Sequence, residues 1–318
     1  MAPHQLSAGT PGAFRHEALL YAGDDGFLAG TLPFIRGGVE AGEPVLVVVA
    51  AARISRLRER LGGDAGLVHF ADMAEVGTNP ARIIPAWREF VAERAGPARR
   101  VRGIGEPIWA ERSPDELVEC QRHESLLNVA FAGAPAWWLM CPYDTSALGP
   151  AVIEEARRSH PFLSSAGASG ESGDYRGLTA AAAPFDAPLP AAPRDAARLT
   201  FEADSLALVR QAVVDLGARL GLNGRRTGEL TLAANEVATN SLRHAGGRGL
   251  LRIWADGESV ICEVSDGGRL DRPLAGRERP GREPDGERGL WLANQLCDLV
   301  QVRSSPGGTT VRLHVRRG

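Results

Sequence analysis

Apolar residues in the first half of the chain form short runs separated by longer amphipathic stretches, a pattern typical of alternating strands and helices. Residues 44–50 are apolar on both faces, as expected for a central strand of a covered parallel sheet. Strands are predicted at residues 18–21, 44–50, 67–70, 101–105 and 136–141. Helices are predicted at residues 25–40, 53–61, 80–95, 114–131 and 150–159. This half is therefore expected to be an α/β unit with a doubly wound parallel sheet.

Local signals mark one helix start and one linker. Ser113, Pro114 and Glu116 follow the order in which a serine caps a helix and a nearby glutamate can close a capping box. Residues 164–193 are rich in Ala, Gly, Ser and Pro, which favours a linker, although part of it, residues 174–178, can be ordered against a domain. We therefore expect a first domain at residues 1–163, a linker at 164–198 and a second domain at 199–318.

The second half contains a helix with a possible chemical role. Residues 230–245 carry apolar side chains at helical spacing and stop at Gly246-Gly247. Glu236 and Asn240 are four residues apart and share a face of this helix. A carboxylate and a carboxamide so placed can orient a hydroxyl and hold Mg²⁺ through oxygen. Taken alone, the pair favours the alternative of an ordinary helix with two polar residues facing solvent.

The segments after this helix favour a chemical role for Glu236 and Asn240 over that alternative. A hairpin is predicted from residues 250–255 and 260–264, and its second strand runs into Asp266-Gly267-Gly268. A carboxylate beside glycines can accept a hydrogen bond from an exocyclic amine. Residues 271–285 are rich in Arg, Pro, Gly and Glu and predict a loop. The loop ends in a glycine step that opens an amphipathic helix, a place where free N–H groups bind phosphate, before two final strands at 299–303 and 309–315.

The order of these sequence motifs, or boxes, resembles the ATP-binding module of the GHKL superfamily. Anti-sigma-factor serine kinases are the members most similar in the segment Glu236-Val-Ala-Thr-Asn240-Ser-Leu-Arg-His-Ala. The resemblance covers about residues 199–315 and implies a GHKL (Bergerat) α/β sandwich with a mixed or antiparallel sheet. It implies ATP and Mg²⁺ as cofactors, Glu236 as catalytic base, Asn240 as the Mg²⁺ ligand and residues 271–285 as the ATP lid. The residues expected at the nucleotide are Asn240, Asp266, Gly268, Gly286, Arg288, Gly289, Leu290 and Thr309.

Two positions depart from the family pattern. The adenine box commonly reads Asp-x-Gly-x-Gly, and Leu270 fills its last glycine position. The second glycine box commonly reads Gly-x-Gly, and Glu287 stands at its first glycine, with Gly286 one residue earlier. Both changes concern the lid and the rate of phosphoryl transfer, so ATP binding is a firmer inference than catalysis.

The first half resembles the MEDS sensory domain of dichloromethane-regulator-type proteins. The matching segments are residues 14–21, 34–44, 105–109, 124–128 and 141–144. The resemblance implies a RecA-like fold, yet the sequence has no Gly-x-x-x-x-Gly-Lys loop and no lysine at all, so ATP hydrolysis by this half is not expected.

Ligands of open α/β sheets bind beyond the carboxyl ends of the strands. A sensor pocket for a small-molecule signal is therefore one hypothesis, and its candidate residues are His16, Glu106, Trp109, Glu124, Asn128, Cys141 and Tyr143. The alternative is that Trp109 and Tyr143 pack at the sheet edge and Glu124 is solvated. A metal site at His16 and Cys141 is less favoured than a structural role. The other histidines singled out, His123, His160 and His244, are interpreted as ordinary surface or capping residues.

Composition limits the partners and the cellular location expected for the protein. A formal net charge of −3 argues against direct nucleic-acid binding. All 36 basic residues are arginine, which we attribute to base composition of the genome. The four cysteines form no Cys-x-x-Cys pair and are interpreted as buried thiols in a reducing compartment. No signal core and no membrane span is predicted, so a cytoplasmic location is expected.

Three functional hypotheses remain open. The chain is interpreted first as an anti-sigma regulatory serine kinase that phosphorylates a STAS-type anti-anti-sigma protein, sequesters a sigma factor, or both. The second hypothesis is a non-catalytic ATP-binding partner-switch module. The third, a degenerate histidine-kinase-like protein, lacks the long helix with a phosphoacceptor histidine that such a kinase needs. The resembling kinases also imply a homodimer.

Overall fold

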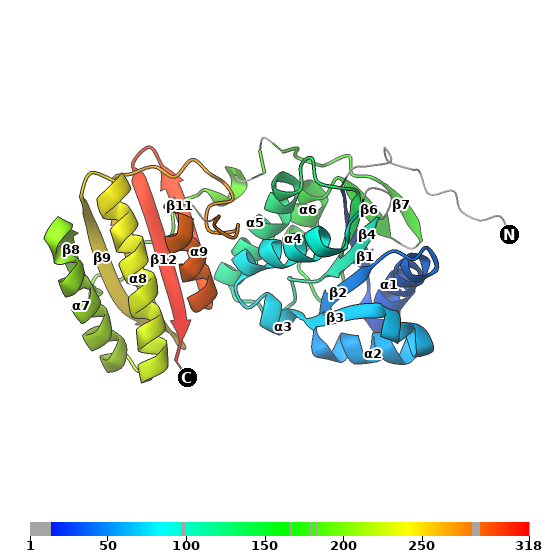
Figure 1. Cartoon of the computed structure of the whole chain (residues 1–318), viewed down its shortest axis with the longest axis horizontal. Helices are drawn as coiled ribbons and strands as arrows, with labels where there is room; N and C mark the ends of the chain where they lie inside the picture. Colours follow the sequence, from blue (N-terminus) through cyan, green and yellow to red (C-terminus); the bar gives the residue numbers. More distant parts are fainter. Residues whose placement is uncertain are drawn as a thin grey trace. The chain divides into compact units, whose positions relative to one another are not determined.

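The computed structural model describes residues 14–96, 100–165, 167–178, 180–181, 183–281 and 287–317. The chain divides into two compact α/β units, Met1–Ala182 and Ala183–Gly318 (Figure 1). Within the described ranges, none of the helices has the length and apolarity that crossing a bilayer requires.

The first unit is built on a seven-stranded sheet in the order β3-β2-β4-β5-β1-β6-β7. Six of these strands pair in parallel, and β7 alone runs antiparallel to its neighbour β6. The strands are β1 (Arg15–Tyr21), β2 (Val45–Val49), β3 (Val68–Asp72), β4 (Val101–Gly105), β5 (Trp137–Asp144), β6 (Phe162–Ser165) and β7 (Ala168–Glu171). The mostly parallel sheet predicted from the apolar runs is confirmed.

Helices cover both faces of this sheet, because alternate side chains of its strands bury in opposite directions. Leu19 and Tyr21 of β1 join one core with residues of α1 and α2, whereas His16 of β1 faces α5. The helices are α1 (Gly23–Glu40), α2 (Ala51–Leu61), α3 (Met73–Val76), α4 (Ile83–Arg94), α5 (Pro114–Ala130) and α6 (Pro150–Ser159), with short 3₁₀ turns η1 (Gly62–Leu67) and η2 (Pro80–Arg82).

The N-terminus of α5 has the cap that its sequence predicts. The Ser113 hydroxyl accepts from the backbone N–H of Glu116 at 3.3 Å, and the Glu116 carboxylate accepts from the backbone N–H of Ser113 at 2.9 Å. This reciprocal pair fixes the start of the helix that carries Glu124 and Asn128.

The first sheet extends into the range that composition assigned to the linker. β6 adds to β1 and β7 adds to β6, so ordered strands continue to Glu171, beyond the expected domain boundary at residue 163. Main-chain hydrogen bonds hold β6 and β7 in the sheet, and these bonds do not depend on apolar side chains. The composition of the segment therefore did not reveal the two strands. Further along, Arg176 donates two hydrogen bonds of 2.8 Å to the carboxylate of Glu155 and ties this segment to α6.

The second unit is a sandwich of helices on an antiparallel sheet in the order β11-β12-β10-β9-β8. The strands are β8 (Ala197–Glu202), β9 (Arg248–Asp256), β10 (Ser259–Asp266), β11 (Leu299–Ser305) and β12 (Gly308–Arg316). The helices are α7 (Leu206–Arg219), α8 (Gly224–His244) and α9 (Glu287–Leu296), with 3₁₀ turns η3 (Ala183–Phe185) and η4 (Ala203–Ser205). One core joins apolar residues of these helices with those of the sheet. The antiparallel sandwich expected for this half is confirmed.

The end of the expected linker lies on this sheet. The Arg312 guanidinium of β12 donates to the carbonyl of Pro190 at 2.7 Å and to the buried carboxylate of Glu263 at 2.6 Å. Ala192 and Ala196 pack on Trp254. The last residues before β8 therefore belong to the second unit.

Candidate functional site

A cavity of about 460 Å³ opens in the second unit beside α8 and the segment that follows β10. Five of the eight residues expected to contact a nucleotide line it: Asn240, Asp266, Gly268, Leu290 and Thr309. Of the remaining three, Arg288 and Gly289 belong to α9 but do not line the cavity, and Gly286 lies outside the described residues. The cavity therefore gathers residues from α8, β10, α9 and β12.

The carboxylate of Asp266 is held in one orientation at the end of β10. Its Oδ2 accepts from the Ser241 hydroxyl of α8 at 2.6 Å, and its Oδ1 accepts from the backbone N–H of Gly268 at 2.8 Å. A carboxylate has four lone-pair positions, so both oxygens can still accept from a ligand amine. The sequence analysis assigned no role to Ser241, and its hydrogen bond to Asp266 was missed.

A second hydrogen-bond chain fixes the floor of the cavity. The Thr309 hydroxyl donates to the carbonyl of Gly268 at 2.9 Å and lies 2.9 Å from the Ser304 hydroxyl. That hydroxyl accepts from the backbone N–H of Leu270 at 2.8 Å. Leu270, at the position of the family's last glycine, thus starts the loop with its backbone anchored and its side chain against the core.

The first turn of α9 lies very close to α8. A Cβ built on Gly289 would stand 2.8 Å from the Nδ2 of Asn240 and 3.3 Å from the Cβ of Glu236. Both α8 side chains are half-buried. Asn240 lines the cavity, whereas Glu236, one turn earlier, does not. A side chain at position 289 would therefore displace the Asn240 amide from its place at the cavity.

The described part of the predicted lid is fastened to α9. The Asn294 amide donates to the carbonyl of Gly276 at 2.9 Å. Gly276 has φ of +73°, and a Cβ there would stand 2.8 Å from Asn294 Nδ2 and 2.9 Å from Leu290 Cβ, so only glycine fits this close approach. Arg288 is exposed, and its guanidinium donates to the carbonyl of Gly281 at 3.4 Å.

The residues expected to share a pocket in the first unit separate into groups. The Tyr21 hydroxyl donates to the carboxylate of Glu106 at 2.8 Å, and Arg53 pairs with the same carboxylate. Trp109 instead stacks under Arg112, whose guanidinium carbon lies 3.8 Å from the ring centroid. Glu106 and Trp109 are thus occupied with partners that the pocket hypothesis did not include.

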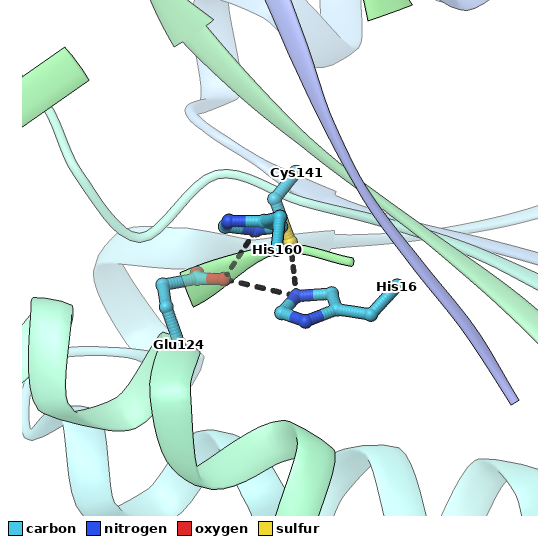
Figure 2. Close-up of side chains that lie close together, drawn as sticks. All are labelled: His16, Glu124, Cys141 and His160. Carbon is cyan, nitrogen blue, oxygen red and sulfur yellow. Dashed lines mark hydrogen bonds and ion pairs between the residues drawn. The ribbon is translucent and has the colours of Figure 1, made fainter. Parts of the chain in front are cut away.

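The other expected residues converge on a buried cluster around Glu124 (Figure 2). Glu124 Oε2 lies 3.2 Å from His16 Nε2 and 3.1 Å from His160 Nε2. The Cys141 thiol lies 3.4 Å from His16 Nε2, and the Tyr143 ring meets His160 edge-on at 5.5 Å. The interpretation of Glu124 as solvated is wrong, because its exposed fraction is 1%. The interpretation of His123 and His160 as ordinary surface or capping residues is also wrong, because their exposed fractions are 1% and 0%.

Burial and contact set the charges of this cluster. Burial, together with the nearby His160, lowers the pKa of His16 from 6.5 to about 4, against the opposite effect of Glu124. Burial alone would raise the pKa of Glu124, but the close contacts with the imidazoles of His16 and His160 hold it well below its usual range. The cluster therefore contains an ionised carboxylate beside a neutral imidazole.

The sequence model of the MEDS family, the methanogen/methylotroph DcmR sensory domain, matches residues 15–161, and that of the histidine kinase-like ATPase domain matches residues 199–315. The chain joins a MEDS domain to a histidine kinase-like ATPase domain. The resemblances to the MEDS domain and to the GHKL ATP-binding module are confirmed, and this pairing is that of a signalling regulator. Histidine kinase-like ATPase domains bind ATP, usually with Mg²⁺.

A crystal structure of the RsbU and RsbW domains of a Mycobacterium tuberculosis protein matches at 20% identity with a TM-score of 0.31, over 39% of this chain and 33% of that one. The chain thus spans about a third of that structure's length. The comparison with curated proteins found no match.

The cavity of the ATPase domain fits the nucleotide that its family binds. Asp266 offers a fixed acceptor at one side, and the Asn240 carboxamide lies beside the first turn of α9 at the other. Gly268 lines the cavity without a side chain, and a Cβ on it would stand 2.7 Å from Ala245 Cβ. Carboxamide oxygen is a suitable ligand for Mg²⁺.

Proposed function

We propose that the chain is an ATP-dependent protein serine/threonine kinase controlled by its MEDS domain. Its substrate in this proposal is a STAS-type anti-anti-sigma protein, and its unmodified partner is a sigma factor that it sequesters. The observation that carries the proposal is the single cavity in which Asp266, Asn240 and Thr309 come together beside the glycine-opened helix α9.

Each residue has a distinct role in this proposal. Asp266 accepts a hydrogen bond from the adenine amine, oriented by Ser241 and Gly268. Asn240 would hold Mg²⁺ through its carboxamide oxygen, and the ion would supply charge neutralisation at the phosphates. Glu236 accepts the proton of the substrate serine hydroxyl as general base.

The proposed signal, oligomeric state and location of the kinase are inferred as follows from its two domains. The MEDS domain receives a small-molecule signal, and the ATPase domain delivers the output to a protein partner. Leu208 of α7 is 60% exposed and Leu232 of α8 is 44% exposed, which supports a homodimer that covers them. The proposal places the protein in the cytoplasm, where ATP and both partners are present.

The second candidate function is a binding module that uses ATP to shape a partner surface without transferring phosphate. One observation favours it: Glu236 is not among the residues that line the cavity, whereas Asn240 and Asp266 are. A histidine-kinase-like role is the third candidate, and it requires a phosphoacceptor histidine presented by another chain.

Phosphoryl transfer distinguishes these functions. The full chain is incubated with a STAS-domain substrate, Mg²⁺ and γ-labelled ATP, and the modified residue is identified by mass spectrometry. The proposal expects phosphoserine or phosphothreonine on the substrate, and Asn240→Ala should abolish it. ATP-dependent partner binding without any label on the substrate would instead establish the binding module. Phosphohistidine would establish the third candidate.

A further inference from the structure

Four potential metal ligands from four segments meet in the interior of the MEDS domain. His16 comes from β1, Glu124 from α5 and Cys141 from β5, and His160 follows the last residue of α6. One nitrogen, oxygen or sulfur atom of each lies within 4.8 Å of the corresponding atoms of the other three. Figure 2 shows the Glu124 side chain reaching from its helix towards both imidazoles and the thiol.

We propose that His16, Glu124, Cys141 and His160 bind one divalent transition-metal ion, with Zn²⁺ as the ion that fits best. Zinc–ligand distances of about 2.0–2.2 Å for nitrogen and oxygen and about 2.3 Å for sulfur place tetrahedral donors about 3.3–3.7 Å apart. Three donor pairs are separated by 3.1, 3.2 and 3.4 Å, close to that spacing, and all four donor atoms lie within 4.8 Å of one another.

The surrounding residues orient the imidazoles for this role. His16 Nδ1 lies 3.1 Å from the carboxamide oxygen of Asn128, and His160 Nδ1 lies 2.8 Å from the carbonyl oxygen of Ala156. An acceptor at Nδ1 favours the tautomer with its proton there, because the carbonyl of Ala156 has no proton to give. Each Nε2 then presents a lone pair towards Glu124. Partners of this kind position metal-binding histidines in proteins.

The cluster has more acceptors than protons. His160 Nε2 lies 3.1 Å from Glu124 Oε2, yet its geometry is not that of a hydrogen bond. Glu124 Oε1 also has no hydrogen-bond partner among the described residues. Buried polar atoms are rarely left in this condition, because their lost hydration is not replaced. A cation between the lone pairs satisfies them together.

The donor set selects the class of metal. One thiolate, two imidazoles and one carboxylate suit Zn²⁺ or Co²⁺, whereas Mg²⁺ and Ca²⁺ prefer oxygen ligands alone. All four side chains have exposed fractions of 0–1%, and four protein ligands leave no open position on a tetrahedral ion. The site thus has the form of a structural centre that joins β1, β5 and α5.

Cobalt provides the spectroscopic test because Co²⁺ replaces Zn²⁺ and gives a charge-transfer absorption when a thiolate binds it. The full chain is stripped with a chelator and titrated with Co²⁺, then with Zn²⁺ in competition. We expect one equivalent of Co²⁺ to produce the thiolate band and Zn²⁺ to remove it. Cys141→Ser should lose the band, and Asn128→Ala should weaken binding by about 10- to 100-fold.

Cys120 supplies the matched control. It is a buried thiol on the same helix as Glu124, one turn away, and it donates to the carbonyl of Pro107 at 3.3 Å. Cys120→Ser should keep the band at full strength. A wild-type chain without a stoichiometric thiolate band, or a Cys141→Ser chain with an unchanged band, would overturn the proposal.

A second variant covers the case in which Cys141→Ser does not fold, as judged by circular dichroism. Glu124→Gln keeps the size of the side chain and all the other ligands, and its Zn²⁺ affinity should be at least tenfold lower than that of wild type. Equal Zn²⁺ affinity would leave the four side chains as a hydrogen-bonded cluster without metal, and the proposal would be wrong.

Discussion

Gly289 of α9 approaches Asn240 of α8 so closely that a methyl group on it would lie 2.8 Å from the amide nitrogen of Asn240. The contact is with the end of a side chain, so the helices can stay in place while the amide turns away. In the proposed function this amide holds Mg²⁺. A side chain at position 289 should therefore disturb the proposed Mg²⁺ ligand without unfolding the domain.

Gly289→Ala should lower Mg-ATP affinity by about tenfold or more, which is about 1.4 kcal/mol, while the chain unfolds at nearly the wild-type temperature. Isothermal titration calorimetry with and without Mg²⁺ measures the loss. Gly228→Ala is the matched control, because it lies on α8 and a Cβ there meets nothing within 4 Å. Equal weakening by both substitutions would remove Asn240 from the site.

Asp266→Asn should weaken ATP binding by about 10- to 150-fold, since a hydrogen bond to a charged group contributes about 1.5–3 kcal/mol. The substitution keeps the shape of the side chain, but the amide loses one acceptor oxygen. Binding of ATP and of GTP, which lacks the adenine amine, is compared by calorimetry. Asp256→Asn, at the exposed end of β9, should change neither affinity. Wild-type ATP affinity in Asp266→Asn would exclude the adenine contact.

Local patterns in the sequence were sufficient for much of the fold. The apolar run of β2, the Ser113 cap and the hairpin of β9 and β10 each involve neighbours along the chain, and each is confirmed. The family resemblance selected Asn240, Asp266 and Thr309, and all three line one cavity. Their selection and their chemical roles both rest on the family.

Contacts between distant segments could not be predicted in the same way. Ser241 reaches Asp266 across 25 residues, and no local pattern marks that pair. His160 follows a helix end, where a histidine is common, and its meeting with Glu124 depends on how α6 packs beside α5. The strands β6 and β7 form at a sheet edge through main-chain bonds, so their small and polar residues gave no apolar signal.

Glu236→Gln should preserve ATP affinity and lower the rate of phosphoryl transfer by about 10²–10⁴, the usual contribution of a positioned general base. The substitution removes the proton acceptor and keeps the side-chain length beside Gly289. Single-turnover transfer to the STAS substrate and ATP calorimetry are measured on the same preparation. Glu258→Gln in the β9–β10 turn is the control. A Glu236→Gln chain that transfers phosphate at the wild-type rate would show that another group is the base.

The last prediction concerns alkaline pH and the buried thiol of Cys120. Burial raises the pKa of Cys120 from 9.0 to about 12, whereas in the unfolded chain the thiol ionises near its ordinary value. Above pH 9 the unfolded chain therefore binds fewer protons than the folded one, and stability falls as pH rises. At pH 10 this thiol alone should cost about 1.4 kcal/mol of unfolding free energy relative to pH 8.

Cys120→Ala isolates that contribution. Removing the thiol also leaves a small cavity, which lowers stability by the same amount at both pH values. The difference between pH 8 and pH 10 should therefore be about 1.4 kcal/mol smaller in the variant than in wild type. Urea unfolding of the full chain, followed by tryptophan fluorescence, gives both values; four of the six tryptophans lie in the first unit. If wild type and variant lose stability in parallel between these pH values, the thiol of Cys120 ionises as readily in the folded protein as in the unfolded chain.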